Sequence, residues 1–480
     1  MTQTRPLAVI VLAAGQGTRM KSPLPKVLHP VGGRPILGAI LEAASALAPE
    51  RTIVVVGPRQ GEVAAFAAAK GAIPALQDPP HGTGHAAQCA LPALDGFKGD
   101  VLILYGDTPL LTAATLERLV AAKGAAALAL LGFTPDDPGP YGRLILDADG
   151  GLSKIVEAKD ASPEERAVRL CNAGGFVLDA ELLRELLGEL TADNAQGEYY
   201  LTDIVTGARR RGLRAVAYDA PADDVMGVNS QAERAAAEAV FQARARAAHM
   251  AAGVMLADPA TVYFSADTTI GPGTAIGENV VIGPGVSIAA GVTIKPFCHL
   301  EGVSIASGAT VGPFARLRPG SVIGEDVHIG NFVETKAATL EKGAKANHLT
   351  YLGDVSVGAG ANIGAGTIPC NYDGFFKYRT EIGAGAFVGS NTALVAPVSI
   401  GARANIGAGS TITKDVAADA LALARGAQSE KPGWAARFRA LTGGRVPTCA
   451  TPVEIVAFRL LPFGRLAGLL AGRGFAALQV

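Results

Sequence analysis

The second half of the chain repeats an aliphatic residue at every sixth position. An α-helix turns about 100° per residue, so this spacing would scatter the side chains over several faces. Side chains of extended chain alternate with a period of two, which divides six, so all of them can point inward. The pattern therefore predicts a parallel β-helix of hexapeptide repeats. The repeated residues are Ile270, Ile276, Ile282, Ile288, Ile294 and Leu300, then Ile305, Val311, Leu317, Ile323 and Ile329, and later Ile363, Ile382, Val388, Leu394, Ile400, Ile406 and Ile412.

The first half instead alternates aliphatic runs with segments rich in Ala, Glu and Leu. This alternation predicts an α/β domain with parallel strands, in which ligands bind beyond the carboxyl ends of the strands. The apolar run that ends at Gly15 also has the form of a short signal peptide, but the glycine loop that follows favours a buried strand. We expect strands at Val9–Leu12, Thr52–Val56 and Val101–Leu104, and helices at Ile36–Leu47, Ala113–Ala122 and Ala180–Leu187.

A linker helix is expected between these two regions. Ser230 and Glu233 have the spacing of a capping box, and the Ala-, Arg- and Glu-rich run after them should be helical until about Gly253. The segment 373–380 interrupts the hexads and is expected to be an extruded loop. The predicted organisation is an α/β domain at residues 1–228, the linker helix at 229–253, the β-helix at 254–425 and a tail at 426–480.

Composition narrows the possible functions. The formal net charge is −1 and no long run of like charges occurs, which argues against a nucleic-acid partner. The five cysteines follow no zinc or disulfide spacing, which fits a reducing, cytoplasmic environment. No stretch reaches about 18 uninterrupted apolar residues, so we expect no stable membrane insertion.

A glycine loop follows the first predicted strand, in the segment Leu12–Met20, and Pro25-Lys26 comes shortly after it. Glycines let the backbone approach phosphates, and successive N–H groups supply donors. Arg19 and Lys26 would neutralise a triphosphate and its departing pyrophosphate. The Walker spacing is absent, and Met20 stands where the dinucleotide fingerprint requires glycine. The motif resembles that of the nucleoside-diphosphate-sugar pyrophosphorylases, which implies that a nucleoside triphosphate binds here.

The same resemblance suggests a metal site and a substrate pocket. Asp107 and Asn229 resemble the Mg²⁺ ligands of that family, although by spacing alone each is also a candidate helix cap or turn residue. Two protein ligands suffice when phosphate oxygens complete the coordination of Mg²⁺. The segment around Gln77 and Gly82–His85 resembles the uracil-reading part of the family. The residues implied to bind UTP and the sugar nucleotide are Leu12, Ala13, Ala14, Gly15, Arg19, Lys26, Gln77, Gly82, Thr83, Tyr105, Gly106, Asp107, Gly142, Glu157, Asn172 and Asn229.

Two further features of this resemblance are less easily assigned. The segment 194–203 is a long and specific match, but no role for its individual residues follows from the sequence. Ala173 stands where the family usually has threonine, which removes a hydroxyl group beside Asn172.

Motifs within residues 314–374 of the hexad region resemble those of one family, the bifunctional N-acetylglucosamine-1-phosphate uridyltransferase/glucosamine-1-phosphate acetyltransferases. The resemblance covers residues 5 to 435 and implies a Rossmann-like nucleotidyltransferase domain followed by a left-handed β-helix. It further implies a cytoplasmic homotrimer with two activities. Glucosamine-1-phosphate is acetylated from acetyl-CoA, and UMP is then transferred from UTP to N-acetylglucosamine-1-phosphate, giving UDP-N-acetylglucosamine.

His348 is the general base that this resemblance implies, because an imidazole accepts a proton from an amine near neutral pH. Outside such a motif, a surface histidine is most often inert. Glu334 is a candidate to orient it, and Pro369 stands where the family usually has threonine. The implied sugar-phosphate contacts are Arg318, Lys336, Tyr351, Asn362 and Lys377, and the implied acetyl-CoA contacts are Ala365, Asn371, Tyr372, Ser390, Ala408 and Arg425.

Two alternatives remain open from the sequence. The chain could be a nucleotidyltransferase with one activity whose β-helix only builds a trimer, or a non-enzymatic solenoid that binds a partner. The chemistry of the glycine loop argues against the second alternative. The tail at 441–480 lies beyond the resemblance, and its spaced arginines suggest either an interfacial helix or a segment without fixed structure.

Overall fold

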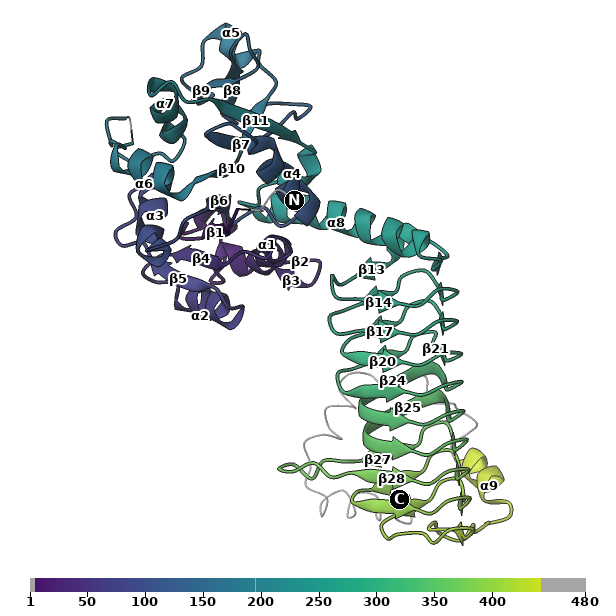
Figure 1. Cartoon of the computed structure of the whole chain (residues 1–480). Coiled ribbons are helices and arrows are strands. Elements are labelled where there is room, and N and C mark those ends of the chain that lie inside the picture. Colours follow the sequence, from purple (N-terminus) through teal and green to yellow (C-terminus); the bar gives the residue numbers. More distant parts are fainter. Residues whose placement is uncertain (1–4, 195, 442–480) are drawn as a thin grey trace. The chain divides into compact units, whose positions relative to one another are not determined.

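The computed structural model describes residues 5–194 and 196–441 (Figure 1). The chain forms two compact units, Met1–Ala424 and Arg425–Val480. The first unit holds the α/β domain and the β-helix, and the described part of the second holds one helix, α9 (Trp434–Leu441). The predicted role of the segment 442–480 lies outside the described residues.

The α/β domain is built on one sheet with the strand order β11-β7-β10-β6-β1-β4-β5, to which β8 and β9 are attached. The pairing of β1 with β4 and with β6 is parallel, as predicted. The sheet is nevertheless mixed, because β10 runs antiparallel to both β6 and β7. Its strands are β1 (Leu7–Leu12), β4 (Arg51–Val56), β5 (Ile73–Leu76), β6 (Asp100–Tyr105), β7 (Leu128–Phe133), β8 (Arg143–Leu146), β9 (Leu152–Val156), β10 (Cys171–Asp179) and β11 (Ala215–Ala220), and a separate pair is β2 (Pro30–Val31) with β3 (Arg34–Pro35).

Helices cover both faces of this sheet, because alternate residues of each strand point to opposite sides. Val9 and Val11 pack in the cluster that contains residues of α1, α2 and α4. Ala8 and Ile10 pack in the cluster that contains residues of α3, α6 and α7. The helices of the domain are α1 (Ile36–Ser45), α2 (Gly61–Ala69), α3 (Thr83–Ala90), α4 (Ala113–Lys123), α5 (Pro163–Arg166), α6 (Ala180–Gly188) and α7 (Asp203–Arg210).

The predicted linker helix is α8 (Gln231–Ala251), so the expected helix is confirmed. Ser230 is its N-cap and accepts a hydrogen bond from the backbone N–H of Glu233. The Glu233 carboxylate does not complete the reciprocal capping box in this structure. It accepts instead from the backbone N–H of Asn229.

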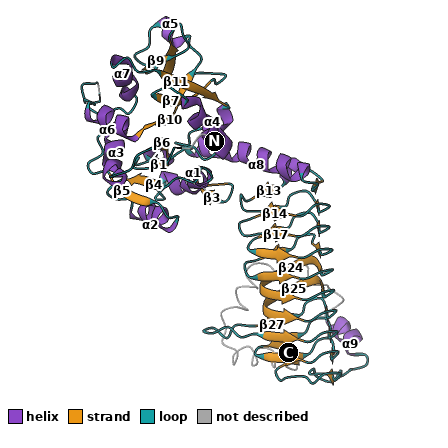
Figure 2. Cartoon of the chain, in the orientation of Figure 1, coloured by secondary structure: helices purple, strands orange, loops and turns teal. Residues whose placement is uncertain are grey.

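The hexad region forms a left-handed β-helix of short parallel strands, as predicted (Figure 2). Equivalent hexads lie in register on successive coils, so that Ile276 is paired with Ile294 and Ile282 with Leu300. The inward aliphatic side chains therefore stack into one continuous buried core. The strands are β12 (Met255–Leu256), β13 (Tyr263–Phe264), β14 (Thr269–Ile270), β15 (Ala275–Ile276), β16 (Val281–Ile282), β17 (Ser287–Ile288), β18 (Thr293–Ile294), β19 (His299–Leu300), β20 (Val303–Ile305), β21 (Thr310–Val311), β22 (Arg316–Leu317), β23 (Ser321–Ile323), β24 (His328–Leu340), β25 (Lys345–Val357), β26 (Asn362–Ile363), β27 (Ile368–Cys370), β28 (Thr380–Ile382), β29 (Phe387–Val388), β30 (Ala393–Val395), β31 (Val398–Ile400), β32 (Asn405–Ile406), β33 (Thr411–Ile412) and β34 (Leu421–Ala422).

The gap in the hexad pattern between residues 329 and 363 is not a break in the β-helix. The two longest strands of the solenoid, β24 and β25, lie there and pair along most of their length. Small residues take the inward positions, with Thr335 and Ala346 fully buried. Pro369 also occupies an inward position six residues after Ile363 and is buried. The predicted extruded loop is confirmed between β27 and β28, where the Phe375 side chain is 87% exposed.

Candidate active sites

A cavity of about 490 Å³ lies at the carboxyl ends of β1 and β6. Leu12 and Tyr105, the last residues of these two strands, are paired in register, so the loops that follow them are adjacent. The predicted phosphate loop and the predicted magnesium carboxylate therefore face the same space, together with Lys26 and Gln77. The residues that line the cavity are Leu12, Ala13, Ala14, Gly15, Gln16, Lys26, Val27, Gln77, Pro80, Gly82, Thr83, Ala86, Tyr105, Gly106, Asp107 and Glu198.

Lys26 joins three segments that are distant in the sequence. Its Nζ donates to Asp107 Oδ2 at 2.7 Å and to Asn229 Oδ1 at 3.0 Å. Gly17 has a φ of +61°, and a Cβ placed there would lie 2.6 Å from the Cβ of Lys26. Glycine at this position thus allows both the left-handed backbone and the close passage of the lysine stem.

Gln77 fixes the wall of the cavity next to α3. The Gln77 side chain is buried, and its Nε2 donates to the carbonyl oxygen of Gly82 at 2.9 Å. Thr83 Oγ1 accepts from the N–H of Leu201 at 3.0 Å, and the N–H of Gly84 donates to the carbonyl oxygen of Tyr199 at 2.7 Å. The matched segment around residues 198–201, which had no derivable role, therefore supports the wall that contains Gly82 and Thr83.

A second group of predicted residues lies around Tyr105. Burial raises the pKa of the Tyr105 hydroxyl, and the nearby carboxylates of Asp107 and Glu157 raise it further, so the group remains a neutral donor. A Cβ on Gly142 would lie 3.7 Å from Glu157 Oε1. The N–H of Asn172 donates to the carbonyl oxygen of Gly142 at 2.8 Å. The structure thus brings the predicted sugar-pocket residues together at this end of the domain.

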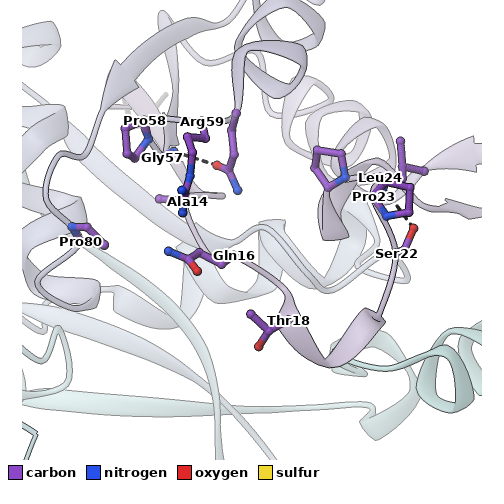
Figure 3. A pocket seen from close by; sticks show the side chains of 12 residues that line it. Ala14, Gln16, Thr18, Ser22, Pro23, Leu24, Gly57, Pro58, Arg59 and Pro80 are labelled. Carbon is purple, nitrogen blue, oxygen red and sulfur yellow. Dashed lines mark hydrogen bonds between the residues drawn. The ribbon is translucent and has the colours of Figure 1, made fainter.

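Arg19 is placed differently from the other predicted residues. It is exposed in the short 3-10 helix at Thr18–Met20 and is not among the residues that line the cavity. Beside the phosphate loop lies a second cavity of about 530 Å³, into which Figure 3 shows Gln16 and Arg59 projecting. Gln60 ties the two sides of this cavity together, because it accepts from the N–H of Gly57 at 2.7 Å and donates to the carbonyl oxygen of Gly15 at 3.0 Å. No signal in the sequence indicated this contact.

The second predicted site lies on β24 and β25 of the β-helix. His348 is exposed on β25 and stands in register with Asn331 on β24. The Nδ1 atom of His348 lies 2.8 Å from Asn331 Oδ1. Glu334, the residue expected to orient this histidine, accepts a hydrogen bond from Arg318 at 2.8 Å. The ring partner that the structure shows is therefore Asn331, and the role of Glu334 stays a prediction.

Three cationic side chains gather near this strand pair. The contact with the Lys377 side chain and its charge hold the pKa of Lys336 below its usual value. Desolvation and the charge of Arg318 lower this pKa further, and Asp354 opposes the effect. Neighbouring like charges destabilise one another, and an anion bound between them would offset this repulsion. Tyr351 lies beside Glu334 in the strand register. Arg318, Lys336 and Lys377 thus give this part of the strand pair a positive charge, which suits an anion.

The predicted acetyl-CoA contacts lie one coil apart along the β-helix. The carbonyl oxygen of Ala365 accepts from the N–H of Asn391, and that of Ser390 accepts from the N–H of Gly409. Asn371 is buried, and its Nδ2 donates to Asp354 Oδ2 at 2.6 Å. The remaining three, Tyr372 in the extruded loop, Ala408 and Arg425 at the start of the second unit, are exposed.

Comparison with known proteins covers both halves of the chain. The MobA-like NTP transferase domain model matches residues 9–138, and the bacterial transferase hexapeptide model matches residues 265–296 and 379–414. A protein of Paramagnetospirillum magneticum named bifunctional protein GlmU is 55% identical over 437 residues, which are 90% of this chain and 97% of that protein. Its namesake in Rhodospirillum rubrum is 57% identical over 443 residues, 92% of this chain and 98% of that protein.

Solved structures match about half of the chain at much lower identity. A putative glucose-1-phosphate thymidylyltransferase from Bacillus anthracis is 19% identical, with a TM-score of 0.40, and the match covers 49% of this chain and 94% of that chain. Within residues 5–194 and 196–441, no helix is long and apolar enough to cross a membrane.

Proposed function

Because this chain belongs to the family of bifunctional GlmU proteins, we propose which of its residues carry out the two transfers that the enzyme catalyses. The enzyme acetylates glucosamine-1-phosphate with acetyl-CoA and then transfers UMP from UTP to N-acetylglucosamine-1-phosphate. We assign uridylyl transfer to residues 1–228 and acetyl transfer to residues 254–425, with the linker helix at 229–253 and a tail at 426–480. The alternative of a nucleotidyltransferase whose β-helix only builds a trimer is disfavoured, because the relatives of this chain are named as bifunctional.

In the α/β domain, the sugar-phosphate oxygen attacks the α-phosphorus of UTP and pyrophosphate leaves. Such a transfer depends on positioning and charge neutralisation more than on a protein nucleophile. The N–H groups of the glycine loop and the Lys26 ammonium receive the phosphates, with Arg19 as a second cation. Gln77 and Gly82 contact the uracil ring, and Glu157 and Asn172 contact the N-acetylated sugar.

Asp107 and Asn229 would hold the Mg²⁺ that this transfer uses. Their oxygens already share one cation, the Lys26 ammonium, so the site fits a small positive charge. Both ligands are oxygens, as Mg²⁺ prefers, and substrate phosphates would supply the remaining ligands. When bound, the metal neutralises negative charge that develops on the phosphates.

In the β-helix, His348 takes the proton from the glucosamine-1-phosphate ammonium group, which frees the amine to attack the thioester of acetyl-CoA. Asn331 accepts a hydrogen bond from Nδ1 of this ring, which leaves Nε2 as the basic atom. Arg318, Lys336 and Lys377 hold the sugar phosphate. The observation that carries this assignment is the strand register that sets His348 beside Asn331, with His348 Nδ1 and Asn331 Oδ1 2.8 Å apart.

The remaining acetyl-transfer contacts are assigned by the family motifs and by their place on the coils. Tyr351 and Asn362 complete the acceptor pocket of the sugar phosphate. The acetyl-CoA contacts are Ala365, Asn371, Tyr372, Ser390, Ala408 and Arg425.

We also propose that the enzyme is a cytoplasmic homotrimer. An exposed apolar column supports self-association, because Phe297 stacks on Phe314 and Phe314 stacks on Phe332, with ring centroids 4.8 and 5.2 Å apart. These side chains are 46–55% exposed, and Leu349 continues the column. Burial against a neighbouring copy would remove this surface from water.

Two substitutions test the assignment of the two sites. His348→Ala should abolish acetyl transfer and leave uridylyl transfer near the wild-type rate, and Asp107→Ala should do the reverse. Acetyl transfer is measured through the release of the CoA thiol. Uridylyl transfer is measured through the release of pyrophosphate. Acetylation at the wild-type rate by His348→Ala would remove the histidine from the mechanism.

A further inference from the structure

The Lys26 ammonium bonds to both oxygens that we assign to Mg²⁺. Its Nζ lies 2.7 Å from Asp107 Oδ2 and 3.0 Å from Asn229 Oδ1. The Lys26 and Asp107 side chains are only 12% and 23% exposed, so solvent and salt screen this ion pair weakly. In this state the carboxylate is already neutralised by a cation from the protein itself.

A lysine ammonium and a metal ion cannot use these oxygens together. Mg²⁺ requires its oxygen ligands at about 2.0–2.1 Å and would lie close to Nζ, where two positive charges repel. The inner part of the lysine stem is held in place, because it passes against Gly17. Only the outer part of the side chain is then free to move, and it lines the same cavity as Gly15 of the phosphate loop.

We propose that Lys26 competes with the metal for Asp107 and Asn229 and yields the site when a triphosphate binds. Phosphate oxygens in the cavity offer the ammonium a new and more highly charged partner within reach of its flexible stem. Its departure uncovers the two oxygens at the moment when the phosphates can supply the other metal ligands. Nucleotide therefore binds with the metal or before it, and metal binds weakly on its own. This inference rests on the proposed metal site.

The test measures metal binding without nucleotide and without turnover. Mn²⁺ is titrated into the full-length protein, and free Mn²⁺ is followed by electron paramagnetic resonance. Lys26→Met should bind Mn²⁺ at least about tenfold more tightly than wild type, which corresponds to about 1.4 kcal/mol. Lys26→Arg retains the charge and should stay close to wild type. Lys21→Met, which removes an exposed lysine nearby, should also change the affinity by less than about twofold.

A second substitution separates failure of this inference from failure of the metal site. Asp107→Asn in the Lys26→Met background should remove the gain in affinity. If it does not, the metal binds elsewhere and the assignment of Asp107 is wrong. If Asp107→Asn weakens binding but Lys26→Met alone binds no more tightly than wild type, the metal site stands and the competition is refuted. Lys26→Gln, with a thermal unfolding curve for each protein, repeats the comparison should Lys26→Met fold poorly.

Discussion

Replacing Gly364 with alanine tests how closely the coils must approach at the acetyl-transfer site. Gly364 follows the inward Ile363, and a Cβ placed there would lie 2.6 Å from the backbone nitrogen of Ser390 and 2.6 Å from the carbonyl oxygen of Val388. Real Cβ atoms stay beyond 3.0 Å. The two coils must therefore separate by about 0.4 Å to reach 3.0 Å, and by about 0.8 Å to reach ordinary contact at 3.4 Å.

This separation of the coils should lower the rate of acetyl transfer strongly and the stability of the protein only modestly. Overpacking of this kind costs about 1–3 kcal/mol, which a long solenoid absorbs locally. A displacement of about 1 Å in a catalytic constellation can reduce the rate about 100-fold. The shift moves Ser390 relative to Asn362 and Ala365, so we expect kcat/KM for acetyl-CoA to fall about tenfold. Uridylyl transfer should remain within about twofold of wild type.

The matched control is Gly283→Ala. Gly283 follows the inward Ile282 in the same hexad position, but its Cβ would lie 3.2 Å from the carbonyl oxygen of Leu300 and needs a shift of only a few tenths of an ångström. Both activities of this variant should stay within about twofold of wild type, measured by thiol release and pyrophosphate release. If folded Gly364→Ala acetylates as fast as Gly283→Ala, the spacing of these coils does not set the rate and the reasoning fails.

Three further predictions concern the β-helix. Asn331→Ala should lower kcat of acetyl transfer by about tenfold to 100-fold, part of the contribution of a positioned base, and should leave uridylyl transfer near the wild-type rate; an unchanged kcat of acetyl transfer would mean that Asn331 does not orient the histidine. Phe314→Glu should reduce the mass of the oligomer measured by light scattering, because it places a charge on the apolar column, whereas Phe314→Leu should not reduce it. An unchanged mass for Phe314→Glu would place the subunit contact elsewhere. Cys298 should resist a maleimide at pH 8 until the protein unfolds, because burial raises the pKa of its thiol to about 11, while the exposed Cys370 should react. Mass spectrometry of the labelled peptides compares the two rates, and equal rates would contradict the prediction.

Local patterns in the sequence predicted most of the fold, because the spacing of residues close together in the chain decides which side chains share a face. The step of six specified the β-helix, since only extended chain places such residues on one inward face. The pattern faded between residues 329 and 363, where Thr335 and Ala346 fill inward positions that larger aliphatic residues take elsewhere. The reciprocal capping bond from Glu233 was expected at Ser230, but the carboxylate accepts from the N–H of Asn229 instead.

For both sites, the sequence indicated candidate residues but not the contacts between them. The residues assigned from the glycine loop and from the segments around Gln77 and Asp107 line one cavity. Arg19, however, lies outside that lining. The partner of His348 was expected to be Glu334, three residues from Asn331 along β24. Strand pairing places Asn331 directly beside the histidine, and the role of Glu334 stays a prediction.

The sequence by itself determined the two architectures and the chemical types of their residues, because side-chain period and glycine placement are local properties of the chain. Only the tertiary structure decided which of these residues meet. The Lys26 ammonium reaches Asn229 across 203 positions of sequence, and no local pattern encodes that distance. The parallel order of β1 and β6, together with the cap that begins α8, brings the three segments to one edge of the sheet. Long-range contacts of this kind arise from the packing of whole elements, which is why they become visible only in the folded protein.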